Sequence, residues 1–464
     1  MNTSPHIPLP LDWDASPHDI LAAWPPSLRL ASLWSGPTSP TPPSSRWSFF
    51  SSPSKRLALG PAATPAHLHQ LFPSPAHPHT PDPLLPPFRS GWLGYISFDL
   101  GRRLEPHAQS PSPPLFTPDL ALWPLAEFHR LDWALAFDNL HARWFFAGNP
   151  DLAPDGLAPS SLPPFSVSNL RTDLPQADFL ARVRRALDLI HAGDVYQVNL
   201  THSLSASFSG SARSLFSSLT HAANPWFGAY LEADDLASRR AFLSASPELF
   251  LSFDAATRTL TTRPMKGTRA DLHADALRDS PKENAELNMI VDLMRNDLGR
   301  VCEPGTVRVA SPRDIESHGA PSAALLQATA TITGRLRDDL SPADALLACF
   351  PGGSITGAPK IRAMQIIDEL EPSRRGPYTG AHGYIDDSGS FAFGISIRTA
   401  LLTGQPGPHH DLFSDATLRY GIGAGIVADS DPASEWLETL DKASVLRAAT
   451  GLHPSPPLPH TPNH

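Results

Sequence analysis

The chain has 464 residues and a formal net charge of −10; 41% of its residues are hydrophobic, 52 are proline and two are cysteine. This length fits two or three domains or one large layered unit, and the acidic balance argues against a nucleic-acid partner. No segment reaches the roughly 18 apolar residues of a membrane span, no signal peptide is apparent, and two cysteines make no disulfide framework, so we expect a cytoplasmic enzyme without a membrane partner.

Short strands and proline-rich loops are predicted for the first third of the chain. Residues 90–105 mix aromatic, glycine and β-branched residues, as a buried strand leading into a turn does. Residues 125–148 predict two strands around an Asp-Asn turn. The proline- and serine-rich segment 149–169 predicts the main boundary, between an N-terminal domain over residues 1–165 and a second domain over residues 170–450.

Two long helices are predicted after this boundary. Apolar residues recur at helical spacing from Gln176 to Gly193 and again over residues 280–301. In the second helix Ser280 fits as the N-cap and Pro281 as the first helical residue.

Strand patterns lie between and after these helices. Residues 240–253 predict a strand pair, and residues 376–402 predict a hairpin that turns at residues 387–389. Residues 434–450 predict the last helix, and the proline-rich tail 451–464 is expected to be disordered. Hairpins mixed with long helices indicate an α+β fold of large mixed or antiparallel sheets flanked by helices.

Two pairs of glutamates have the spacing that places both members on one side of a helix. Glu283 and Glu286 form the first pair, and Glu435 and Glu438 form the second, with Lys442 one turn further on. Two such helices could together hold Mg²⁺, which prefers oxygen ligands. The alternative is that Glu283 only caps its helix and that Glu438 makes an exposed ion pair with Lys442.

A glycine-rich segment, residues 351–371, leads into a predicted helix with Pro359 near its first turn. Ser354 and Thr356 supply hydroxyl groups there, and the free N–H groups of a helix start can bind an anion. The segment lacks the ending of an ATP-binding phosphate loop, so a small carboxylate is the expected ligand. A glycine-rich turn that only begins a helix is the alternative.

A strand with Ile395, Ile397 and Thr399 on one face is predicted to carry Arg398 on the other. Such an arginine can bind a carboxylate through two hydrogen bonds or make a structural ion pair. Further on, Gly423 and Gly425 leave a strand without side chains, which suits either close approach by a ligand or a β-bulge.

Lys266 lies in the stretch TTRPMKGTR, residues 261–269. A lysine in a turn is usually a solvated charge, and it becomes a nucleophile only when its surroundings favour the neutral amine. The local pattern leaves both interpretations open.

Taken together, these segments resemble the chorismate-utilising enzymes. The resemblance runs from about residue 175 to 448 and rests on GDVYQVNLT, SASPELF, RPMKGTR, AELNMIVDLMRNDLGRV, FPGGSITGAPKIRAMQIIDELEP, SIRTAL and GIGAGIVADSDPASEWLETLDKA. It implies that Glu286 and Glu438 hold Mg²⁺ on the substrate, with Glu283 and Glu435 beside them. The residues that it implies in chorismate binding are Ser354, Tyr378, Arg398, Gly423, Gly425 and Lys442.

Two positions indicate the branch of the family. Gln197 stands where the isochorismate and salicylate synthases carry a lysine base, which argues against water as the nucleophile. Lys266 and Thr268 match a PxKGT motif of the aminodeoxychorismate synthases, whereas anthranilate synthases usually have alanine at the lysine position. The resemblance implies that Lys266 attacks ring carbon 2 before ammonia enters at carbon 4. It also implies that Glu248 is an acid near this site that assists proton transfer, and a charge that only ends a strand is the alternative.

The resemblance also has departures and implies a partner. Gln327 stands where the family has a substrate-contacting histidine, and His318 is a possible substitute at the wrong spacing. The chain contains no glutaminase motif, so a separate glutamine amidotransferase subunit is expected to supply ammonia. Two alternatives remain: anthranilate synthase component I, and a catalytically inactive subunit that only binds a partner.

Overall fold

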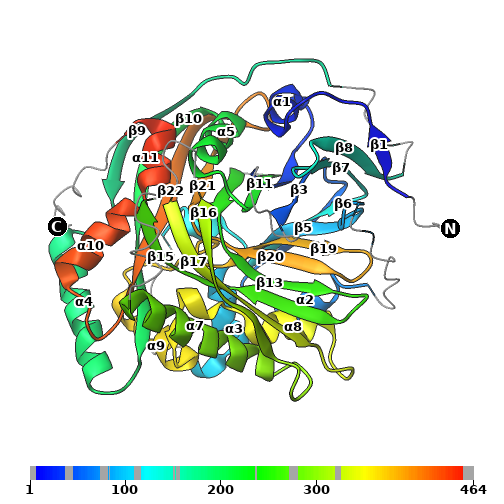
Figure 1. Cartoon of the computed structure of the whole chain (residues 1–464). Helices are drawn as coiled ribbons and strands as arrows, with labels where there is room; N and C mark the ends of the chain where they lie inside the picture. Colours follow the sequence, from blue (N-terminus) through cyan, green and yellow to red (C-terminus); the bar gives the residue numbers. More distant parts are fainter. Residues whose placement is uncertain are drawn as a thin grey trace.

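A computed structural model shows two stacked β-sheets with helices packed around them (Figure 1). It describes residues 7–36, 45–73, 82, 84–108, 117–149, 152, 157–235, 238–270, 281–318 and 325–452. The side chains of Thr268, Glu283 and His318 and most of the predicted disordered tail lie outside the described residues, as does the predicted N-cap Ser280.

The first sheet has 12 strands within the described part of the chain, all paired antiparallel. In pairing order they are β1 (Leu9–Leu11), β8 (Arg143–Gly148), β7 (Trp133–Asp138), β3 (Trp47–Ser51), β2 (Ala31–Trp34), β11 (Phe227–Asp234), β12 (Arg239–Ser246), β21 (Thr399–Pro406), β22 (Leu412–Ile426), β10 (Gln197–Ser211) and β18 (Gly357–Ala358), with β9 (Phe165–Thr172) beside β10.

The second sheet has 10 described strands and is also antiparallel. In pairing order they are β15 (Met265–Ala270), β17 (Leu325–Arg335), β14 (Thr259–Arg263), β13 (Leu249–Asp254), β20 (Phe391–Ile395), β19 (Ala381–Asp386), β5 (Gly91–Ile96), β6 (Ala126–Leu131) and β4 (Lys55–Leu59), with β16 (Arg308–His318) beside β17. The predicted α+β class with large sheets is confirmed.

Both sheets combine strands from the two regions predicted as separate domains. In the first sheet β2 pairs with β11, and in the second sheet β5 pairs with β19. The segment 149–169 therefore does not divide the sheets, although it is the clearest linker in the sequence. Long-range strand pairing of this kind leaves no local composition signal, which is why the sequence could not show it.

Helices lie outside the sheets (Figure 1). Their bounds are α1 (Pro17–Ala23), α2 (Pro65–His69), α3 (Gly101–Leu104), α4 (Gln176–His191), α5 (Ala212–Ala223), α7 (Pro281–Gly299), α8 (Pro342–Cys349), α9 (Lys360–Leu370), α10 (Pro432–Asp441) and α11 (Ser444–Thr450). Helix α7 packs on β17, α5 on β12, α9 on β10 and α10 on β22, while α4 packs on α10. Among the described helices, none is long and apolar enough to cross a membrane.

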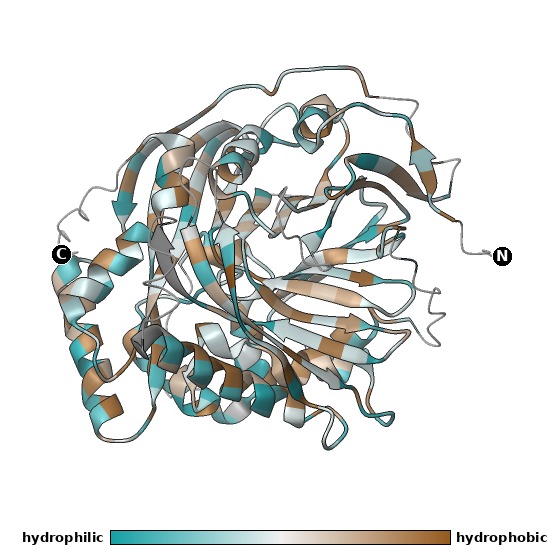
Figure 2. Ribbon diagram, in the orientation of Figure 1, coloured by the Kyte–Doolittle hydropathy of each residue, from teal (hydrophilic) through white to brown (hydrophobic). Residues whose placement is uncertain are grey.

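The apolar core occupies three layers because strand side chains alternate between the two faces of each sheet. One layer lies between the sheets, where the rings of Tyr95 on β5 and Phe242 on β12 stack with centroids 5.2 Å apart. The other two layers lie under the helices, one on each outer face. Figure 2 shows the result on α7, which carries hydrophobic and hydrophilic residues in alternating bands along its length.

Three local predictions were wrong in detail. Residues 125–148 form three strands, because the chain leaves the second sheet after β6 and enters the first sheet at β7, with only Asp132 between. The predicted last helix is two helices, α10 and α11, broken at Lys442 and Ala443. The predicted strand pair over residues 240–253 is one strand in each sheet, β12 and β13, so the two do not pair with each other.

Candidate active site

Strand β22 presents glycine on one face at alternate positions, Gly421, Gly423 and Gly425. The isoleucine and alanine side chains between them are fully buried in the core. A Cβ added at Gly421 would lie 2.2 Å from the ring of Tyr378, and one added at Gly425 would lie 3.2 Å from Lys266 Nζ. The missing side chains therefore leave the space in which Tyr378 and Lys266 lie.

Lys266 is not a solvated turn charge. It is part of β15, where it pairs with Ala328 of β17. Its Nζ lies 3.5 Å from Oε2 of Glu286 on α7, and the two side chains are only 18% and 19% exposed. The amine is thus placed between an acidic helix and the glycine face of β22.

Gln197 lies at the same place, although it was not among the predicted binding residues. It begins β10, is fully buried, and its Nε2 lies 3.2 Å from the position of a Cβ added at Gly425. Within the described chain, neither Nε2 nor Oε1 has a hydrogen-bond partner. A buried amide is rarely left unpaired, so this pair of atoms is expected to bind something that enters the site. The sequence did draw attention to Gln197, because the isochorismate and salicylate synthases carry a lysine at this position.

Glu248 lies between β12 and β13 and is 5% exposed. Its Oε1 accepts a hydrogen bond of 2.8 Å from Ser354 Oγ. Burial raises the pKa of Glu248 to about 7, although the Ser354 hydrogen bond and the positive charge of Lys266 oppose this rise. A carboxyl group that titrates near neutral pH can give or take a proton under working conditions.

Glu248 is also expected to make stability depend on pH. In the folded chain its pKa is about 7, against an ordinary value of 4.5, so the folded state holds the extra proton between these values. The stabilisation is fully present below the unfolded pKa and is lost as pH rises through the folded one. We expect Glu248→Gln to match the wild type at pH 4.5 and to exceed it by about 3 kcal/mol above pH 8. Urea unfolding at both pH values measures this difference; equal differences at both would contradict it.

Arg398 does not lie in a strand, so the predicted alternation over residues 395–399 is wrong. Strand β20 ends at Ile395, β21 begins at Thr399, and Arg398 between them has a φ of 50°. This left-handed conformation turns the chain and aims the side chain differently from a strand residue. Burial lowers the pKa of Arg398. The nearby Tyr420 and Glu248 side chains act in the opposite direction and raise it. Among the described residues no carboxylate lies within ion-pair distance of its guanidinium, so an anionic substrate group can serve as its partner.

The glycine-rich segment before α9 packs closely against α7 and also contributes a residue to the candidate site. A Cβ added at Gly353 would lie 2.5 Å from side-chain atoms of Leu293 and Met294 on α7. Pro359 is the N-cap of α9, as the sequence indicated. The only hydroxyl of this segment shown to reach the candidate site is Ser354, through Glu248. Binding of a free anion here stays a prediction.

The described acids of the predicted metal site each have a partner. Glu438 lies 2.8 Å from Lys442 Nζ, which also donates a 2.8 Å hydrogen bond to the carbonyl oxygen of Gly423. Glu435 is buried, and its Oε1 accepts a 2.6 Å hydrogen bond from Ser430. The ion pairs Lys266–Glu286 and Lys442–Glu438 thus approach the same strand at positions two residues apart. No cluster of three metal-ligating side chains occurs in the described part of the chain, so the metal stays a prediction.

Gln327 is buried on β17, where it pairs with Glu316 of β16. Lys266 pairs with the next residue, Ala328. Because neighbouring strand residues point to opposite faces, Gln327 is on the opposite face of β17 from Ala328. Its predicted contact with the substrate therefore remains a prediction. The side chains of Thr268 and Glu283, also predicted for the site, lie outside the described residues.

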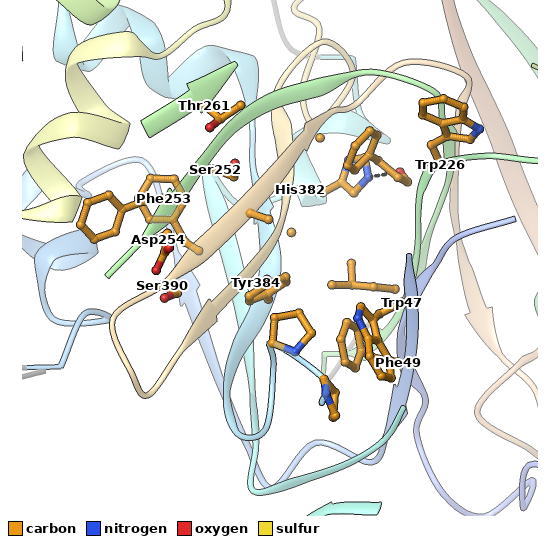
Figure 3. Close-up of a pocket in the computed structure, with 18 of the residues that line it drawn as sticks. Trp47, Phe49, Trp226, Ser252, Phe253, Asp254, Thr261, His382, Tyr384 and Ser390 are labelled. Atoms are coloured by element: carbon orange, nitrogen blue, oxygen red, sulfur yellow. Dashed lines mark hydrogen bonds between the residues drawn. The ribbon is translucent and has the colours of Figure 1, made fainter. Parts of the chain in front are cut away.

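A cavity of about 680 Å³ opens between the two sheets. Figure 3 shows its aromatic lining, which includes Trp47, Phe49, Trp226, Phe253 and Tyr384. None of the candidate catalytic, binding or metal residues lines it. The cavity is therefore separate from the lysine and glutamate site.

The layered α+β fold brings two lysine–glutamate pairs to the glycine strand β22, as the sequence motifs of the chorismate-utilising enzymes led us to expect. The chain belongs to the chorismate binding enzyme family. Its residues 41–448 match the sequence model of that family.

The chain is similar to relatives from two branches of this family. It is 37% identical over 399 residues to aminodeoxychorismate synthase component 1 of Salmonella typhimurium, covering 83% of this chain and 80% of that protein. It is 39% identical over 388 residues to the protein of the same name from Klebsiella aerogenes, covering 81% and 78%. It is 35% identical over 407 residues to anthranilate synthase component 1 of Streptomyces coelicolor, covering 80% and 74%.

Solved structures of the family have the same fold. Anthranilate synthase component I of Streptococcus pneumoniae superposes with a TM-score of 0.66 at 26% identity, covering 87% of this chain and 92% of that one. The menaquinone-specific isochorismate synthase of Escherichia coli gives 0.68 at 18% identity, covering 96% and 95%. At this lower identity the likeness concerns the fold alone.

Proposed function

We propose that the chain is the chorismate-converting component of an aminodeoxychorismate synthase, which makes 4-amino-4-deoxychorismate from chorismate and ammonia. The observation that carries this proposal is the position of Lys266, a largely shielded amine on the glycine face of β22 beside Gln197. The relatives named aminodeoxychorismate synthase component 1 support the same branch.

The described residues offer matching partners for chorismate, which carries two carboxylates and a hydroxyl on a ring. The Arg398 guanidinium suits one carboxylate, because a buried cation without an ion-pair partner gains most from an anion. Tyr378, which lies beside Gly421, and Lys442, which donates a hydrogen bond to the Gly423 carbonyl oxygen, are proposed to contact the chorismate ring and its polar groups. Thr268 and Gln327 complete the proposed set.

In the proposed reaction Lys266 first gives up its proton to solvent, and the neutral amine then forms a bond to ring carbon 2 while the bond from carbon 4 to its hydroxyl breaks. The oxygen leaves as water after taking a proton, and protonated Glu248 is the group with a pKa suited to give it. Ammonia then forms a bond to carbon 4 while the bond between carbon 2 and Lys266 breaks, and the proton that the added nitrogen loses restores the acid form of Glu248. The Gln197 amide can orient the ammonia because both of its polar atoms are available.

Mg²⁺ is proposed as the cofactor, held by Glu286 and Glu438 with Glu283 and Glu435 nearby. Carboxylate oxygens are the donors that Mg²⁺ prefers, so the residues present fit the ion. When bound, it would neutralise a substrate carboxylate and act as a Lewis acid. Lys266 and Lys442 are the cations that pair with these two glutamates in the structure.

Loss of either proposed ligand is expected to weaken Mg²⁺ binding by at least about 100-fold. The variants are Glu286→Gln and Glu438→Gln, which keep the side-chain shape but remove the charge. Titration calorimetry with Mg²⁺ and chorismate measures the affinity independently of turnover. Glu369→Gln on α9, a half-exposed acid that pairs with Arg362, is the control. Unchanged Mg²⁺ affinity in both ligand variants would refute the assignment.

The ammonia is proposed to come from a glutamine amidotransferase subunit, since the relatives are named as one component of a synthase. Both cysteines are free and buried, which suits a reducing compartment, and the cytoplasm is the proposed location.

Product identification tests the proposed function. With chorismate, Mg²⁺ and ammonium, mass spectrometry should detect aminodeoxychorismate, and no pyruvate should be released. Anthranilate and pyruvate would instead support the second candidate, anthranilate synthase component I, which the likeness to the Streptomyces coelicolor protein favours. Calorimetric binding of chorismate without turnover would indicate the inactive subunit.

A further inference from the structure

We propose that Arg375 is a positioning residue for the reaction, which fastens three segments of the site to one another. The inference rests on the proposed function only in assuming that chorismate reacts at this site. Arg375 lies between α9 and β19 and is 4% exposed. It is not one of the proposed substrate-binding residues, and its effect is exerted through residues that neighbour them in the chain.

The guanidinium of Arg375 binds five acceptors on four segments. Nη1 donates to the carbonyl oxygen of Ile355 at 2.9 Å and to Thr379 Oγ1 at 3.2 Å. Nη2 donates to the carbonyl oxygen of Asn199 and to Glu371 Oε1, both at 2.7 Å. Nε donates to Glu371 Oε2 at 2.9 Å. A lysine has no planar fork and cannot reach all of these acceptors at once.

Each fastened segment carries a residue of the candidate site. Ile355 follows Ser354, whose hydroxyl holds Glu248. Asn199 is two residues from Gln197 on β10, and Thr379 follows Tyr378. The Arg375 guanidinium therefore sets the relative positions of three site residues: Ser354, which binds Glu248; Gln197, whose amide has no partner among the described residues; and Tyr378.

The ion pair between Arg375 and Glu371 also fixes β10 against the glycine strand. Glu371 Oε1 accepts hydrogen bonds from Thr201 N at 2.8 Å and Thr201 Oγ1 at 2.9 Å. Asn199 pairs with Gly425 and Thr201 pairs with Gly423 in the sheet. The pair thus holds β10 at the two positions opposite the site glycines. Phe98, whose ring centroid is 4.3 Å from the guanidinium carbon of Arg375, packs against the cation.

The test compares Arg375→Lys with Arg213→Lys. Arg213 is a matched control, because it is also buried, pairs with Glu232 and donates to backbone carbonyls, but belongs to α5. We expect both variants to unfold at lower temperature. Only Arg375→Lys should lower kcat by about 10- to 100-fold with KM changed less than threefold, because misplacement by about 1 Å costs that much. An equal kcat loss in both variants, or none in Arg375→Lys, would overturn the proposal.

Two further measurements keep the outcome decisive. If Arg375→Lys does not fold, Glu371→Gln replaces it, and an unchanged kcat in that variant overturns the proposal. Ser354→Ala combined with Arg375→Lys should lower kcat by less than the product of the single effects, because both act on one segment. Rates are followed as chorismate consumption. A wild type that forms anthranilate therefore refutes the proposed function but still tests Arg375; no consumption at all would refute both.

Discussion

Lys266→Ala is expected to lower aminodeoxychorismate formation by at least about 10³-fold, because removal of a covalent nucleophile leaves only binding and electrostatic contributions. KM for chorismate should change much less, since the amine forms its bond during the reaction. The measurement is the steady-state rate with ammonium, Mg²⁺ and chorismate, with every product identified by mass spectrometry.

Lys266→Arg is the matched control for this prediction. It keeps a cation beside Glu286, whose carboxylate lies 3.5 Å from Lys266 Nζ, but cannot act as the nucleophile. An equal loss of activity in Lys266→Ala and Lys266→Arg would support a covalent role for Lys266. Activity retained in Lys266→Arg would show that charge alone is needed, and full activity in Lys266→Ala would exclude the covalent role.

Arg398→Met is expected to weaken chorismate binding by about 2–5 kcal/mol, which corresponds to about 30- to 5,000-fold in affinity. The reason is that the substrate carboxylate would be buried without its charged donor. In the absence of chorismate the same variant should be at least as stable as the wild type, since a buried cation that has no ion-pair partner among the described residues is costly. Titration calorimetry and thermal unfolding measure the two effects.

Arg419→Met gives the opposite pattern and serves as the control. Arg419 is also a largely buried arginine, on β22, but its Nη2 lies 3.0 Å from Asp173 Oδ2. Loss of this paired arginine should lower stability and leave chorismate affinity nearly unchanged. A destabilised Arg398→Met variant with normal affinity would show that Arg398 is structural.

Local elements with a strong periodic pattern could be predicted from the sequence. The helix predicted from Gln176 is α4, and the hairpin predicted to turn at residues 387–389 is β19 and β20. The break between α10 and α11 was missed because residues 434–450 keep a helical pattern across it. Asp132, where the chain changes sheets, was missed because both flanking strands look alike in sequence.

For the candidate site, too, some features could be predicted from the sequence and others could not. The glycines of β22 and the basic and acidic residues could be selected from the motifs, because each carries its own chemical type. Their partners could not, since Lys266 meets a helix 20 residues later and a strand about 160 residues later. Gln197 was singled out by the resemblance alone, but its unpaired buried amide, and the role of Arg375, are seen only when burial and hydrogen bonds are known.

The sequence by itself determined the family, the α+β class and the residue types available for chemistry, because these depend on motifs and on short-range periodicity. The tertiary structure decided which of these residues meet. It placed Lys266 against Gly425, turned Arg398 out of a strand through a positive φ, and joined three site segments at Arg375. The physical reason is that these contacts depend on how two sheets stack and how strands distant in the chain align, which local spacing does not encode.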